Sequence, residues 1–165
     1  TYTGSSQGAT ATTSPAGLVV SFSYNGSGTA PTNAGSYAVV ATINDTNYQG
    51  TATGTLVIGK ATATVTLGGL SRTFNGGPQG ATATTTPAGL TVNLTYNGSA
   101  TAPTNAGTYA VVGTINDTNY EGSASGTLVI AKAPATVTLG GLSRTYTGSA
   151  QGATATTNPD GLAVS

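Results

Sequence analysis

The 165-residue chain contains no cysteine, histidine, methionine or tryptophan, and charged residues make up only 5% of it. Without cysteine there is no disulfide framework and no thiolate chemistry. Without histidine as well, neither a Ser-His-Asp nor a Cys-His arrangement can form, and the common zinc ligand sets are missing. These absences predict a protein that is not an enzyme and that has no catalytic, cofactor-binding or metal site.

The few charges are balanced, with four Lys or Arg residues against four Asp or Glu residues. A nucleic-acid partner requires a basic surface, so none is expected. Asp117 and Glu121 are the one close carboxylate pair within a repeat, and Gln49 stands at the position of Glu121 in the preceding copy. General acid–base catalysis is therefore not predicted. No apolar run reaches the ~18 residues of a membrane span, so none is expected in this segment.

What the chain does have is a repeat. Residues 73–144 align with residues 1–72 without insertion or deletion, and 55 of the 72 positions are identical. Residues 145–165 begin a third copy. A period of 72 exceeds the roughly 20 to 50 residues of solenoid repeats and approaches the size of a small domain. Each copy is therefore predicted to fold as a domain of its own.

The repeat is rich in β-branched residues, with 35 Thr in the chain, and apolar side chains alternate with polar ones. In the second copy the expected core-facing residues are Leu90, Val92, Leu94, Tyr96, Tyr109, Val111, Ile115, Ala124, Leu128 and Ile130. Period-2 alternation indicates half-buried strands, about six or seven per copy. The predicted fold is all-β: tandem small Ig-like β-sandwich domains with mostly antiparallel strands. A β-grasp-like arrangement stays open as the alternative.

Turn residues separate the expected strands. The sequence TTPAG at 85–89 predicts a type I turn at Pro87 followed by a left-handed Gly89, which would make a hairpin of residues 79–85 against 90–96. Asn97 and Gly98 are expected to end the second of these strands. A further turn is expected at Asn116–Asn119.

Very short connections separate the expected domains, and Pro134 stiffens one of them. The predicted frame is a partial domain at 1–58 that lacks its first strand, a complete domain at 59–131 and a partial domain at 132–165. We expect the chain to be a segment of a longer array.

Two resemblances follow from these residues. The strings NAGSY at 33–37 and NAGTY at 105–109 match the tyrosine corner of immunoglobulin-like domains, in which the Tyr hydroxyl bonds to nearby backbone. More specifically, residues 96–130 resemble the MBG-type repeats found in tandem in large bacterial surface and adhesin-like proteins. That resemblance covers essentially the whole chain and implies a secreted, repetitive β-domain at the cell surface.

Three local features have competing interpretations. The NDTN segments at 44–47 and 116–119 are interpreted as Asx turns, since one Asp is too few for a calcium loop. Lys60 and Lys132 are interpreted as solvated residues beside a domain junction, although an isopeptide crosslink is the alternative. Tyr48 and Tyr120 are expected either to cover the joint with the next domain or to stack on a sugar.

The function predicted from these features is structural: the repeats act as a stiff spacer or filament building block in an extracellular bacterial fibre, stalk or adhesin. The expected partners are neighbouring copies of the repeat. The alternative is a binding module for glycan or ice that uses ranks of Thr, as at Thr10–Thr12, Thr82–Thr84 and Thr136–Thr138. A separate hypothesis is a donor-strand fibre, in which a partial domain accepts a strand from another chain.

Overall fold

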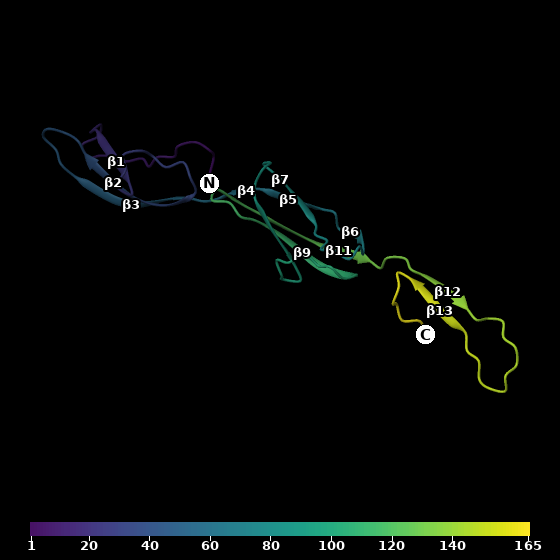
Figure 1. Ribbon diagram of the computed structural model, residues 1–165. Helices are drawn as coiled ribbons and strands as arrows, with labels where there is room; N and C mark the ends of the chain where they lie inside the picture. The colour runs from purple at the N-terminus through teal and green to yellow at the C-terminus, as the bar shows by residue number, and fades with distance from the viewer.

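The computed structural model describes all 165 residues and contains strands but no helix. Figure 1 shows three units in succession along an extended molecule: a first repeat, a complete central repeat and a C-terminal hairpin. The prediction of an all-β, mostly antiparallel tandem array of β-sandwich domains is confirmed.

The central repeat is built on a four-stranded sheet with the order β6-β11-β9-β8. Its strands are β6 (Ser71–Thr73), β8 (Val92–Tyr96), β9 (Gly107–Ile115) and β11 (Ser123–Ala131). Strand β9 pairs antiparallel with both β8 and β11, whereas β6 runs parallel to β11. The short β6 is thus the parallel exception within this sheet.

A second layer of two antiparallel strands, β5 (Thr64–Gly68) and β7 (Thr82–Thr86), covers one face of this sheet. The predicted hairpin of residues 79–85 against 90–96 is therefore wrong, because β7 pairs with β5 and β8 lies in the other layer. Alternation alone does not distinguish the two arrangements, since Ala83 and Val92 face the same interior from opposite sheets. The Thr86–Pro87 peptide bond is cis, and Gly89 takes the expected positive φ of 87°.

Side chains from both layers form the core. Val111 and Leu128 are fully buried, and Ile130 and Tyr96 pack with them. Leu67 of β5 contacts this cluster and also a second one formed by Ala63, Val65 and Ile115. The predicted core face of β9 and β11 is confirmed, and β5 covers this face from the other layer.

A short parallel pair secures the start of the central repeat. Strand β4 (Ala61–Thr62) runs beside β10 (Tyr120–Glu121), and the N–H groups of Ala61 and Ala63 donate to the carbonyls of Asn119 and Glu121. The first residues of the repeat are therefore fixed against its last loop.

The first repeat contains the sheet β1-β2-β3, made of β1 (Val20–Tyr24), β2 (Gly35–Ile43) and β3 (Thr51–Ile58). Residues 10–14, which correspond to β7, lie in no strand because no counterpart of β5 pairs with them. At the other end, β12 (Thr136–Gly140) and β13 (Thr154–Asn158) form a hairpin that corresponds to β5 and β7. In the central repeat the first strand comes from the same chain.

Candidate functional site

Of the carboxylate pair singled out from the sequence, Asp117 stabilises the turn that carries it. The Asp117 Oδ1 atom accepts hydrogen bonds from the backbone N–H groups of Asn119 and Tyr120, at 2.7 and 2.9 Å. Asp45 makes the same two bonds in the first repeat. The Asx-turn interpretation of the NDTN segments is thereby confirmed, and no group of three or more potential metal-ligating side chains is present in the structure. Glu121 lies exposed on β10.

The candidate functional site is the contact between the first and central repeats. Only Gly59 and Lys60 separate the end of β3 from the start of β4. The Gly59 carbonyl accepts a hydrogen bond from the Tyr2 N–H at 2.7 Å, and the Lys60 ammonium donates to the Asp117 carbonyl at 2.6 Å. Both connecting residues are thus bonded, one to each repeat. The predicted position of Lys60 beside the junction is confirmed, and the group that it meets is a backbone carbonyl.

We call residues 116–120 the junction loop. Its Asn119 side chain reaches the preceding repeat, where the carboxamide oxygen accepts from the Ala34 N–H at 2.8 Å. The Asn119 amide donates to the Asn33 side-chain oxygen at 3.2 Å. The oxygen and the amino group of one carboxamide are therefore both hydrogen-bonded to the neighbouring repeat. These two bonds fix the separation and relative rotation of the two repeats at this point.

Tyr120 makes an aromatic contact across the same junction. Its ring meets that of Tyr2 edge-to-face, with ring centroids 5.4 Å apart and an interplanar angle of 78°. Such pairs add about 0.5–1.5 kcal/mol beyond the area that they bury. Tyr120 does cover a joint, but with the preceding repeat, because the β4–β10 pairing holds the junction loop at the N-terminal end of its own repeat. The expectation that Tyr120 covers the joint with the next domain is therefore wrong.

The surface that receives Asn119 is a tyrosine corner, residues 33–37, which we call the acceptor corner. The Tyr37 hydroxyl donates to the Asn33 carbonyl at 2.8 Å, which ties down the backbone that Asn119 contacts. Tyr109 and Asn105 repeat this bond at 2.9 Å in the central repeat. The predicted tyrosine corner is confirmed. In the copy at 105–109, Ala106 lines an apolar hollow together with Pro159 and Leu162, which follow β13.

Identical loops with and without a neighbour provide an internal comparison. Tyr120 is half-buried in the junction, whereas Tyr48, at the same position of the first repeat, is 49% exposed. Asp45 holds its loop in the same Asx turn although no repeat packs against it. The loop is thus preorganised by its own Asp, and only the Asn and Tyr side chains are left to make contacts.

Comparison with known families covers the chain from end to end. The model of the MBG domain matches three times, at residues 1–62, 63–134 and 135–165. The chain belongs to the MBG domain family. The match boundaries differ by a few residues from those predicted at 58/59 and 131/132, which stay a prediction. No curated protein and no solved structure matches the chain.

The MBG assignment fits a structural repeat module of a surface protein, with further copies as neighbours. The structure contains no helix, and so none that is long and apolar enough to cross a membrane. The Asn119 contact was not foreseen from the sequence, because Asn residues in turns already have local roles. The sequence does show that both residues of this contact recur. Asn105 stands at the position of Asn33 in the second copy, and Asn47 stands at the position of Asn119 in the first copy.

Proposed function

We propose that these MBG repeats form a stiff spacer within an extracellular bacterial fibre, stalk or adhesin. The observation that carries the proposal is that the Asn119 carboxamide forms two hydrogen bonds with the preceding repeat, one with the Ala34 N–H and one with the Asn33 side-chain oxygen. Two connecting residues leave little chain in which a bend can form. In a stacked array, nearest-neighbour contacts of this kind recur at every junction and add up along the rod.

The surface composition supports the same role. The chain has no net charge and only four Lys or Arg residues, so trypsin-like proteases find few cleavage sites. Cysteine and methionine, the residues most easily oxidised, are missing. These properties suit a spacer exposed outside the cell, where neither repair nor turnover by the cytoplasm is available.

Small-angle X-ray scattering tests the spacer role. It is recorded at concentrations at which light scattering gives the mass of one chain, 15.8 kDa. A stiff spacer gives a rod-like pair-distance distribution that fits the arrangement in Figure 1. Asn119→Ala broadens this distribution, while Asn47→Ala, the same change in a loop without a neighbour, leaves it unaltered. A wild-type curve that requires freely rotating beads would contradict the proposal.

A second candidate function rests on the Thr side chains of the β5–β7 layer. Thr64 lies opposite Thr86 and Thr66 opposite Thr84, and all four are exposed on the outer face. Such an array supports binding to ice or to a glycan. Thermal hysteresis or glycan-array binding that is lost in Thr66→Val would favour it, and the absence of both activities would remove it.

A further inference from the structure

A polar hollow of about 430 Å³ lies in the loop that connects β1 to β2 in the first repeat. Nine residues between positions 24 and 37 line it. Seven of the nine carry a hydroxyl or a carboxamide, the other two are Ala30 and Pro31, and none is charged. The volume falls within the range of about 300–1,000 Å³ that small-molecule sites occupy. The hollow is therefore large enough for a small polar ligand.

The residues that line the hollow recur in the central repeat. Residues 96–109 match residues 24–37 at 12 of 14 positions, and all nine lining residues are among the identical ones. Each lining residue is also buried, half-buried or exposed in the same way as its counterpart. The central repeat has the β5–β7 layer packed on its sheet, and the burial of these residues is unchanged. The loop thus keeps the same conformation whether or not that layer is present.

Tyr37 lines the hollow and is held in a fixed position. Its hydroxyl donates to the Asn33 carbonyl at 2.8 Å. Its ring lies against Gly35, where an added Cβ would come within 3.2 to 3.4 Å of the ring and the hydroxyl. Tyr109 lies against Gly107 in the same way. An immobilised aromatic ring is a surface on which the C–H groups of a sugar ring can pack, because the face of the ring carries partial negative charge.

The hydrogen bonds that hold the loop leave several of its polar groups free. The side-chain oxygen of Asn25 accepts from a backbone N–H of β2 at 2.8 Å, and that of Asn33 accepts from the junction loop at 3.2 Å. The amino groups of these two carboxamides have no partner within the chain, and neither do the hydroxyls of Thr29 and Thr32. The hollow therefore presents two amide donors and two hydroxyls that can donate or accept.

We propose that this hollow binds a neutral carbohydrate, with one site in each repeat. Sugar hydroxyls both donate and accept hydrogen bonds, which matches a lining of hydroxyls and carboxamides. The ring of Tyr37 supplies the contact for the apolar face of the sugar. An anionic ligand would meet no cation among the lining residues to offset the loss of its hydration. The site is distinct from the Thr side chains of the β5–β7 layer and does not depend on the stiffness of the array.

The 72-residue period places such sites in series. One chain carries two of them, at 24–37 and at 96–109. When one ligand reaches both, the second contact is intramolecular, so the overall affinity exceeds that of a single site. A polysaccharide long enough to span two repeats is therefore expected to bind more tightly than a short oligosaccharide of the same sugar.

A printed array of neutral and acidic glycans, probed with the full 165-residue chain, tests the ligand class. We expect binding to neutral glycans, and stronger binding where they are presented as long polymers. Binding to no neutral glycan, or binding confined to acidic glycans, would overturn the proposal.

Removal of hydroxyls from the hollow tests the site itself. Thr29→Val and Thr32→Val are combined with the same changes at their counterparts, positions 101 and 104. Loss of one hydrogen bond weakens binding roughly 2- to 10-fold, so the loss of two in each hollow should weaken it by about 4-fold or more. The matched control combines Thr42→Val and Thr114→Val, which remove exposed hydroxyls from β2 and β9. The control should bind as the wild type does, and equal binding by both variants overturns the proposal.

NMR spectroscopy locates the ligand without any substitution. The neutral glycan bound most strongly on the array is titrated, as a soluble oligosaccharide, into the ¹⁵N-labelled chain. The side-chain amides of Asn25 and Asn33, and of their counterparts Asn97 and Asn105, are expected to shift most. The exposed side-chain amide of Asn93 on β8 should not move. Shifts centred on the backbone amides of β5 and β7 would place the ligand on that layer and overturn the proposal.

Discussion

The side-chain oxygen of Asn119 accepts a hydrogen bond of 2.8 Å from the backbone N–H of Ala34, which lies 85 residues earlier in the chain. The two residues belong to neighbouring repeats, and each is fixed within its own repeat before they meet. Asp117 holds the loop that carries Asn119, and Tyr37 holds the corner that carries Ala34. A joint between two preorganised parts loses little conformational entropy when it forms, which favours one geometry for the pair of repeats.

Asn119→Ala removes both hydrogen bonds of this joint. A partly buried hydrogen bond contributes roughly 0.5–1.5 kcal/mol net, so we expect the free energy of unfolding of the central repeat to fall by ~1–2 kcal/mol. Urea denaturation monitored by tyrosine fluorescence measures the change. Asn47→Ala is the control, because the same Asx turn is present there without a neighbouring repeat. Equal effects of the two substitutions would mean that Asn119 acts only within its own loop.

Gly122→Ala is expected to disrupt the start of the central repeat. An added Cβ would overlap the Ala63 carbonyl, which lies on the connection between β4 and β5. Overpacking of this kind costs about 1–3 kcal/mol, and we expect a lower melting temperature together with faster amide exchange at Ala61 and Ala63. At the matched position Gly50, the nearest atom is a flexible Ile43 methyl at 3.0 Å. Gly50→Ala should therefore be tolerated. A similar fall in melting temperature in Gly50→Ala would argue against a stabilising role of the β4–β10 pairing.

Tyr37→Phe and Tyr109→Phe each remove one hydroxyl that ties down a corner. Each is expected to lower the free energy of unfolding of its repeat by roughly 0.5–1.5 kcal/mol. Only Tyr37→Phe loosens the corner that receives Asn119, so only this variant should shift the side-chain amide resonances of Asn119 in NMR spectra. A shift of the same size in Tyr109→Phe would show that the corner does not organise the joint.

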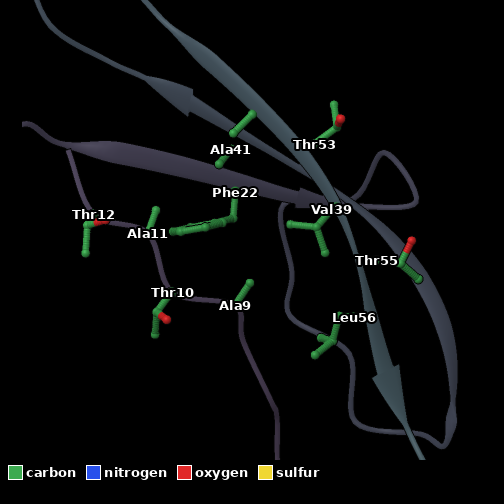
Figure 2. Close-up of a pocket in the computed structure, with 12 residues that line it drawn as sticks. Ala9, Thr10, Ala11, Thr12, Phe22, Val39, Ala41, Thr53, Thr55 and Leu56 are labelled. Carbon is green, nitrogen blue, oxygen red and sulfur yellow. The ribbon is translucent and has the colours of Figure 1, made fainter. Parts of the chain in front are cut away.

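Leu128→Ala is expected to cost ~2–5 kcal/mol, because Leu128 is fully buried between the two layers of the central repeat. Its counterpart Leu56 is only half-buried and lines an apolar groove of about 380 Å³ in the first repeat, which Figure 2 shows. Leu56→Ala should therefore cost clearly less. Thermal unfolding of both variants checks this difference, and an equal loss of stability in the two variants would contradict it.

The alternation of apolar and polar residues was enough to predict the strands and their inward faces. The alternating Leu90, Val92, Leu94 and Tyr96 do line the core, and the NAGTY string does form a tyrosine corner. These features are local, since a strand's period and a turn's bonding partners depend on residues close in sequence.

Strand pairing was not predictable in the same way. Residues 79–85 and 90–96 are close in sequence and alternate in phase, which favours a hairpin, yet they lie in opposite layers. The choice depends on β5, which arrives from the start of the repeat to pair with β7. The contact between Asn119 and Ala34 depends likewise on two repeats that meet, and a sequence pattern within one repeat does not contain it.

The central claim is that the junction loop and the acceptor corner hold consecutive repeats as one body. Backbone ¹⁵N relaxation of the monomeric chain tests it most directly, because the rotational diffusion of each repeat is measured separately. The account predicts that amides of β2 and of β9 fit a single elongated diffusion tensor, and that Asn119→Ala splits it into two. Separate, shorter correlation times for the two repeats in the wild-type chain would contradict it.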